Sequence, residues 1–200
     1  MPMNASVRTR LSPVARKKQL LDTAKGMIVE EGLQLFTMEA LARTAGVTTP
    51  LVYNYFSGRQ VLLKSLLVQE YESYRLKTVA AVGAAKSFDD VVRAYVTSNF
   101  DHHASGSILP ILQSQPEIVE AIELQLKRDG QQDAKFVVQS TARSFKLTKS
   151  QAELVAGMSS GASIAAAQYA GRVKINREKT IENVLAYVLA GISAIVKKTK

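Results

Sequence analysis

The sequence predicts an all-α protein, in which three short N-terminal helices precede a longer series of helices. Apolar residues recur at steps of three and four along most of the 200 residues, which is the periodicity of a helix with one buried face. Glycine, proline or short polar stretches separate these periodic segments. No segment alternates convincingly between apolar and polar residues with a period of two, so strands are not expected.

Composition indicates a soluble intracellular protein, and we expect it in the cytoplasm. Apolar residues make up 46% of the chain, yet no uninterrupted apolar run approaches the roughly 20 residues that span a bilayer. The first residues lack the pattern of a secretion signal. Cysteine is absent, which excludes disulfides and thiolate metal sites and fits a reducing compartment. We therefore expect no membrane partner.

The charge is strongly basic and unevenly distributed. The 26 basic and 17 acidic residues give a formal charge of +9. Basic side chains outnumber acidic ones by about two to one in the first 64 residues. Such an excess favours a polyanionic partner, because Lys and Arg that neutralise phosphates release condensed counterions. A basic balance also serves solubility alone, so charge by itself leaves a nucleic-acid partner open.

The first part of the chain predicts a basic arm followed by two helices. Residues 1–13 are polar and contain two arginines and two prolines, as a flexible basic arm does. A helical pattern begins at Val14 and ends at Gly32, where glycine permits a left-handed backbone. Thr37 stands at an N-cap position, where its hydroxyl accepts a bond from an orphan amide. The short helix that follows is broken by Gly46.

A third helix is expected directly after this break. Thr48 can cap it, and Pro50 is tolerated in the first turn because no intrahelical amide bond is needed there. Val52 and Phe56 turn inward, whereas Thr48 and Thr49 at the start point outward. A short helix placed across another in this way fits a DNA major groove about 12 Å wide. The pattern therefore predicts a helix-turn-helix.

The remaining chain predicts six further helices. They are expected near 59–81, 87–103, 107–114, 116–145, 149–171 and 177–198. The expected breaks are Gly83, Gly106, Pro110, Pro116, Gly130, the polar region 146–150, and Gly171. We expect the arm to span 1–13, the helix-turn-helix domain 14–60 and the larger helical domain 61–200.

The stretch from Lys18 to Leu66 resembles the DNA-binding domain of the tetracycline-repressor-like (TetR) regulators. The residues that carry the resemblance are GLQLFTMEALA at 32–42, AGVTTPLVYNYF at 45–56 and SGRQVL at 57–62. The whole stretch covers about a quarter of the chain, and many positions agree at once. In two departures, Asn54 and Arg59 stand where members often carry His and Lys. Both remain hydrogen-bond donors, and arginine grips a phosphate bidentately.

The resemblance implies roles for individual residues. The residues expected to contact phosphates are Thr37, Tyr53 and Arg59. The residues expected to face base edges are Thr48, Thr49, Leu51 and Asn54. Tyr53 and Tyr55 have an alternative role as core aromatics, which we favour for Tyr55 and not for Tyr53. Arg8 and Arg10 of the arm either enter a minor groove or belong to a solubilising tail, and the sequence leaves both open.

The resemblance also implies that residues from about 70 to 200 bind a small molecule and form a homodimer. The last two helices are rich in glycine, alanine and serine and fit a four-helix bundle between subunits, although buried helices within one chain have the same pattern. The candidate ligand contacts are Tyr95, Asn99, His102, His103, Gln125 and Tyr169. For each of these residues we favour the alternative role of an ordinary core or surface residue. The ligand is expected to be apolar or amphipathic.

Metal, cofactor and enzyme functions find no support in the sequence. His102 and His103 are adjacent, so they do not share a helix face, and the chain has no other His and no Cys. No glycine-rich phosphate loop, nucleophile elbow or pair of carboxylates stands out. We therefore predict a protein without a metal, a cofactor or catalytic residues.

These observations predict a sequence-specific DNA-binding transcriptional regulator of the repressor type, released from a palindromic operator by a small molecule. A two-fold dimer would read half-sites one helical turn apart, roughly 34–36 Å. Ligand would shift the long helix that begins near Arg59 and thereby separate the two reading helices. The alternative is an interaction protein that keeps the helical scaffold without reading DNA. The combination of outward polar residues with a basic N-terminal quarter favours the regulator.

Overall fold

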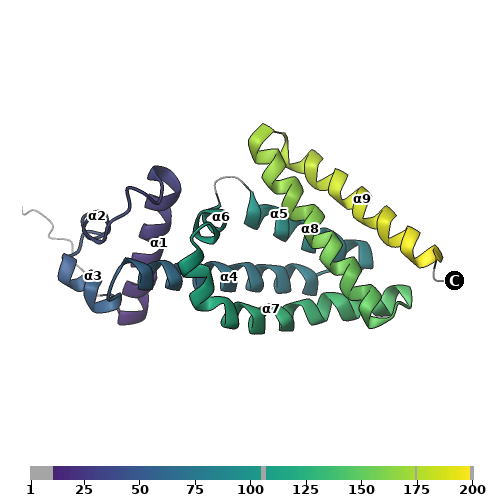
Figure 1. Cartoon of the computed structure of the whole chain (residues 1–200), viewed down its shortest axis with the longest axis horizontal. Coiled ribbons are helices and arrows are strands. Elements are labelled where there is room, and N and C mark those ends of the chain that lie inside the picture. The colour runs from purple at the N-terminus through teal and green to yellow at the C-terminus, as the bar shows by residue number, and fades with distance from the viewer. Residues whose placement is uncertain (1–10, 105–106, 174, 199–200) are drawn as a thin grey trace, which may run out of the picture. The chain divides into compact units, whose positions relative to one another are not determined.

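The computed structural model describes residues 11–104, 107–173 and 175–198, and for residues 121–134, 136 and 198 it describes the backbone. These residues form α-helices, with no strand in the described part of the chain (Figure 1). The helices are α1 Pro13–Glu31, α2 Met38–Thr44, α3 Thr49–Tyr55, α4 Arg59–Gly83, α5 Phe88–His103, α6 Ile108–Gln113, α7 Pro116–Phe145, α8 Lys149–Val173 and α9 Arg177–Lys198. The all-α prediction is confirmed.

Three of the expected breaks lie inside helices. Pro110 is the third residue of α6, where its missing N–H belongs to the unsatisfied first turn and costs little. Gly130 lies in the middle of α7 and Gly171 in the last turn of α8. An internal glycine costs a helix only about 1 kcal/mol relative to alanine, which a long helix tolerates. Helix α7 ends instead at Lys146, which takes a left-handed backbone with φ 55°.

The chain divides into two compact units, Met1–Leu66 and Leu67–Lys200. The expected boundary was at residue 60, so the first residues of α4 pack with the N-terminal unit. The reason is visible in their burial: Leu62, Leu63 and Leu66 are almost fully buried. The predicted arm lies outside the described residues up to residue 10. After it, Ser12 accepts a bond from the Ala15 amide and Pro13 begins α1.

The N-terminal unit is built around one small core. Helix α1 buries an apolar stripe, and Gly32 ends it with φ 90°, a backbone that glycine adopts without strain. Helices α2 and α3 are short and each buries only one side. The buried side chains of the unit include Leu20, Ala24, Ile28, Leu41, Val52, Phe56 and Leu62. The core therefore fixes which sides of α2 and α3 face outward.

In the C-terminal unit, α5 is the central helix. It packs against α7, α8 and α9, which Figure 1 shows around it. Two ion pairs join its exposed edge to α9: Arg93 donates to Glu182, and Arg177 donates to Asp101 through two contacts of 2.7 Å. Because α5 is contacted from several sides, its side chains line the cavity described below.

Candidate nucleic-acid interface and ligand cavity

The turn between α2 and α3 is held by local hydrogen bonds. The Thr37 hydroxyl accepts from the Ala40 amide at 3.0 Å and caps α2, as predicted. Gly46 has φ 64°, a left-handed backbone that favours glycine. The Val47 amide then donates to the Ala42 carbonyl at 3.0 Å. These contacts fix the direction in which α3 leaves the turn.

Helix α3 has a buried side and a polar exposed side. Val52 and Phe56 are fully buried, which confirms the predicted inward face. Tyr53 is 44% exposed, and Asn54 is exposed beside it. Thr48 occupies the N-cap position, but its side chain makes no capping hydrogen bond. Thr48 at the N-cap of α3, and Tyr53 and Asn54 within the helix, are therefore the exposed polar residues among the predicted contacts of this element.

The remaining predicted contacts are less exposed. Thr49 and Leu51 are half-buried, as is Tyr55, in keeping with a packing role for Tyr55. Arg59 is also half-buried, and its Nη2 donates to the Leu33 carbonyl at 2.9 Å. This bond ties the start of α4 to the loop after α1. Because a guanidinium carries five N–H donors, the phosphate contact predicted for Arg59 stays compatible with this positioning role.

Two exposed basic side chains of the N-terminal unit were not among the predicted contacts. Lys17 on α1 places its ammonium 5.8 Å from the centre of the Phe56 ring, so it lies next to the end of α3. Arg43 is exposed in the last turn of α2. Their charge was visible in the sequence. Only the packing of α1 and α2 shows that both residues are presented to solvent.

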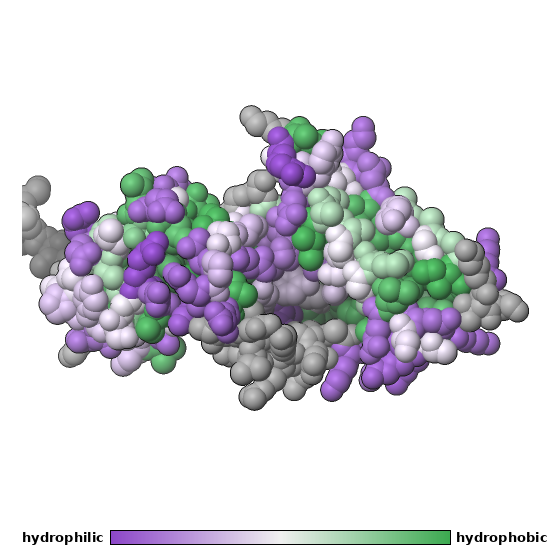
Figure 2. All heavy atoms as spheres, in the orientation of Figure 1, coloured by the Kyte–Doolittle hydropathy of each residue, from purple (hydrophilic) through white to green (hydrophobic). Residues whose placement is uncertain are grey.

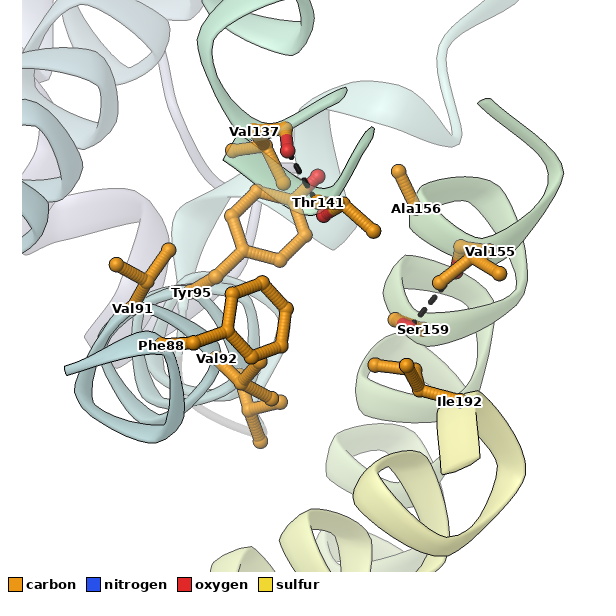
Figure 3. A pocket seen from close by; sticks show the side chains of 11 residues that line it. Phe88, Val91, Val92, Tyr95, Val137, Thr141, Val155, Ala156, Ser159 and Ile192 are labelled. Carbon is orange, nitrogen blue, oxygen red and sulfur yellow. Dashed lines mark hydrogen bonds between the residues drawn. The ribbon is translucent and has the colours of Figure 1, made fainter. Parts of the chain in front are cut away.

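The C-terminal unit contains a small apolar cavity between α5, α7, α8 and α9. Figure 3 shows side chains from these helices facing one another across it. Its lining residues are Phe88, Val91, Val92, Tyr95, Val96, Val137, Thr141, Val155, Ala156, Ser159 and Ile192. None of them is charged. The cavity volume is about 20 Å³, room for about one water molecule, so a larger ligand requires these helices to move apart.

A polar cluster lies at the other end of α5, where α4 and α6 approach it. The Tyr74 phenol donates to Asn99 Oδ1 at 2.7 Å, and Gln113 Nε2 donates to the Tyr71 phenol at 2.7 Å. The Tyr74 and His102 rings are stacked with centroids 4.5 Å apart. Burial raises the pKa of Tyr71 above its usual value, which keeps that phenol neutral. We call these five residues the polar cluster.

The structure places the predicted ligand contacts in different surroundings. Tyr95 lines the cavity, and Asn99 and His102 belong to the polar cluster. His103 is half-buried, and burial lowers the pKa of its imidazole. Tyr169 is 52% exposed on α8 and is not among the residues that line the cavity. The side chain of Gln125 lies outside the described residues.

Most of the cavity-lining residues were missed from the sequence. They come from four helices that are far apart in the chain, and each is an aliphatic, aromatic or small polar residue that also suits a core. The available signal was the spacing on α5, where Phe88, Val92 and Tyr95 follow steps of four and three. That pattern predicts a buried face but does not distinguish a cavity wall from a filled core.

Helices α8 and α9 carry an exposed apolar face. Leu154 is 61% and Tyr187 is 72% exposed, and Figure 2 shows apolar side chains along the visible side of these two helices. The other exposed apolar and small residues on them include Gly157, Met158, Gly161, Ala165, Tyr169, Ala186, Ala190 and Ala194. Such a contiguous face is typical of an interaction surface.

Helix α9 bears on the expectation that no segment of the chain spans a membrane. Among the described residues, the segment 177–197 of α9 is long and apolar enough to cross a bilayer, with a mean hydropathy of 1.4, and 33% of the segment is buried. A core helix of a soluble protein passes the same test, so one such helix is weak evidence. Small residues on its exposed side fit close packing against another helix.

The comparisons with known proteins agree with this architecture. Residues 20–66 match the model of the family described as bacterial regulatory proteins, tetR family. The chain is 34% identical over 90 residues to the HTH-type transcriptional regulator BetI of Rhizobium meliloti, covering 45% of this chain and 44% of BetI. It is 30% identical over 78 residues to the regulator SrpR of Pseudomonas putida, covering 39% and 37%. The matches thus span less than half of these relatives.

Solved structures extend the likeness of fold to most of the chain. The fatty acid degradation regulator FadR of Bacillus halodurans has a TM-score of 0.71 at 19% identity, with 90% of this chain and 97% of FadR covered. The regulator LfrR of Mycobacterium smegmatis, solved with proflavine, has a TM-score of 0.67 at 18% identity, with 90% and 98% covered. These relatives are transcriptional regulators and not enzymes. Residues 20–66 are thus similar to the matched segment of the tetR family of bacterial regulatory proteins, and most of the chain shares the all-α fold of these solved structures.

Proposed function

We propose that this protein is a cytoplasmic transcriptional repressor that binds a palindromic DNA operator as a homodimer and leaves it when a small molecule binds. The observation that carries the proposal is the outer side of α3. There, a polar hydroxyl, a phenol and an amide are exposed on a short helix whose other side is buried in the core. A helix of this kind, in a domain that matches the tetR family, is suited to reading a major groove.

The chemistry of these side chains supports distinct contacts. An asparagine such as Asn54 can bond adenine bidentately, and a threonine such as Thr48 can contact either a base edge or a phosphate. The Tyr53 phenol is suited to a phosphate oxygen. Lys17 and Arg43 add positive charge on neighbouring helices, which strengthens binding to any sequence. The exposed side of α3 would therefore supply specificity, and the surrounding basic residues affinity.

The exposed face of α8 and α9 supports the homodimer. Large apolar side chains such as Tyr187 and Leu154 alternate there with glycine and alanine, so two copies of the face can approach closely. A two-fold dimer uses the same patch on both subunits. It would also present two copies of α3, which fits an operator with two-fold sequence symmetry.

The cavity supports a small-molecule effector, and the regulation would follow from a difference in affinity. A ligand weakens operator binding only if it binds the DNA-incompetent state more tightly, and couplings of about 1–3 kcal/mol are typical. The cavity is small as it stands, so ligand entry would displace the helices that line it. Helix α4 runs from the N-terminal unit into the C-terminal unit and is the element through which such a displacement would reach the DNA-binding domain.

The experiment that tests the proposal is selection of duplex DNA from a random pool by the purified full chain, at fixed and stated salt. We expect an enriched palindrome. The Tyr53→Ala variant should bind it at least about tenfold more weakly, as loss of a charge-assisted phosphate bond implies. Tyr55→Phe is the matched control and should bind as the native chain does.

Two outcomes would contradict the proposal. The absence of any enriched sequence would favour the scaffold protein that does not read DNA. An enriched sequence bound equally well by Tyr53→Ala would show that a surface other than the outer side of α3 reads the DNA.

A further inference from the structure

The cavity and the polar cluster lie along one face of α5. Phe88, Val92, Tyr95, Asn99 and His102 follow steps of four, three, four and three, which keeps them on one side of a helix. The first three line the cavity. The last two belong to the polar cluster. A single helix face therefore changes from apolar to polar between Tyr95 and Asn99, over one turn or roughly 6 Å.

The apolar end offers few hydrogen bonds to a ligand. The Thr141 hydroxyl donates to the Val137 carbonyl at 2.8 Å, and the Ser159 hydroxyl donates to the Val155 carbonyl at 2.7 Å (Figure 3). Both donors are thus used within their own helices. No lining residue is charged, and an unpaired charge is costly in such surroundings. This end suits an uncharged apolar group.

The polar end holds an unused donor. Asn99 is only 3% exposed. Its Oδ1 accepts from Tyr74, but its buried Nδ2 has no hydrogen-bond partner among the described residues. Leaving a buried amide donor unpaired costs about 1–3 kcal/mol, and such a group in a native fold calls for an explanation. An acceptor atom of a ligand at this position would remove that cost.

We infer that the effector is an uncharged amphipathic molecule, with an apolar body held between α5, α7, α8 and α9 and a carbonyl-type acceptor that receives a hydrogen bond from Asn99 Nδ2. The acceptor lies roughly 6–10 Å from the centre of the apolar body, because one to two helical turns separate Asn99 from the cavity wall. The role of this ligand as the effector rests on the proposed function, whereas its binding chemistry does not.

The test uses two probes with the same skeleton. In 4-phenylbutan-2-one a carbonyl replaces one methylene of n-butylbenzene, so the pair differs in the acceptor alone. Dissociation constants are measured on the full chain without DNA by ligand-observed NMR. We expect the ketone to bind about 5- to 150-fold more tightly than the hydrocarbon, the range that satisfying one buried donor implies.

Variants assign this preference to Asn99. Asn99→Leu should abolish the preference for the ketone and leave the affinity for n-butylbenzene within about twofold. Asn99→Asp keeps the shape of the side chain and the oxygen that accepts from Tyr74, but it lacks the Nδ2 donor. This variant replaces Asn99→Leu in the test if Asn99→Leu fails to fold. Tyr74→Phe is the matched control. It removes the bond to Oδ1 without removing Nδ2 and should keep the preference.

A second pair of variants locates the apolar body. Ser159→Leu fills the cavity and should weaken the binding of both probes at least fivefold, as steric exclusion of a buried ligand implies. Ser144→Leu makes the same change at an exposed position on α7 and should leave both affinities unchanged.

The outcomes separate this inference from the proposed function. Failure of both probes to bind, equal affinity for ketone and hydrocarbon, or a preference that survives in both Asn99 variants would overturn the inference. Such a result leaves DNA selection unaffected. If the ketone binds through Asn99 but the chain selects no DNA sequence, the ligand site and its chemistry stand, and the proposed function fails together with the ligand's role as effector.

Discussion

The two units of this protein differ in how their functional residues are arranged along the chain. In the N-terminal unit, the exposed residues of α3 lie within seven consecutive positions, and one buried helix side fixes their direction. In the C-terminal unit, the cavity draws its wall from α5, α7, α8 and α9, across about a hundred residues. A surface built from one short helix depends on local packing. A cavity depends on the mutual placement of long helices, which also allows it to change volume.

Substitution of the core beneath α3 should have the largest effect. Phe56 is fully buried at the end of α3, and Phe56→Ala should destabilise the N-terminal unit by about 3–5 kcal/mol, because it removes a large side chain and leaves a cavity. Urea unfolding followed by circular dichroism would measure the loss. We expect an early transition from the N-terminal unit, with n-butylbenzene binding retained. An equal loss of stability in both units would show that they unfold in a single transition.

The exposed face of the C-terminal unit gives the next largest effect. Tyr187→Asp places a charge on the face that we propose for dimerisation. It should raise the dimer dissociation constant at least about 30-fold, the effect of losing an interface hot spot. Sedimentation equilibrium would measure it. Gln139→Asp, at an exposed position on α7, is the control for charge. A monomeric native chain, or an unaffected dimer, would contradict the assignment of this face.

Most of the fold could be predicted from the sequence because its signals are local. Apolar steps of three and four, with caps such as Thr37 and a left-handed glycine at 46, set the helices to within a few residues. The inward sides of Val52 and Phe56 followed from the same periodicity. The breaks expected at Pro110, Gly130 and Gly171 were wrong, because first-turn prolines and single glycines in long helices cost too little to end them.

The cavity and the polar cluster could not be predicted in the same way. Tyr74 and Asn99 are 25 residues apart, and their hydrogen bond exists only because α4 packs beside α5. The same holds for Tyr71 and Gln113, which are 42 residues apart. A pattern within one helix identifies its buried face, but the partners of that face depend on long-range packing. The sequence therefore suggested Asn99 and Tyr95 singly, without showing that one helix face connects them.

A smaller effect is expected at the start of α4, and it separates positioning from DNA contact. Arg59→Gln removes the bond to the Leu33 carbonyl and should destabilise the N-terminal unit by about 1–2 kcal/mol, as for a charge-assisted hydrogen bond that is partly exposed. Arg59→Lys keeps the charge. If Arg59 also contacts a phosphate, the slope of log affinity against log salt falls by about one in Arg59→Gln and not in Arg59→Lys. Equal slopes in both variants would leave Arg59 with a positioning role alone.

The smallest effect concerns the ion pair between α5 and α9, and it depends on pH. The hydrogen bond from Arg93 lowers the pKa of Glu182 below its usual value of 4.5. Between the lowered and the usual pKa, the unfolded chain binds more protons than the folded one, so stability rises with pH in that interval. The contribution is present above about pH 5 and is lost as the pH falls through the folded pKa. Glu182→Gln should therefore show a shallower fall in melting temperature on acidification than the native chain, whereas Glu120→Gln, at an exposed position on α7, should not. Identical acid profiles for Glu182→Gln and the native chain would mean that this pair adds nothing to the stability of the C-terminal unit in solution, and that its cohesion comes from the apolar contacts of α5.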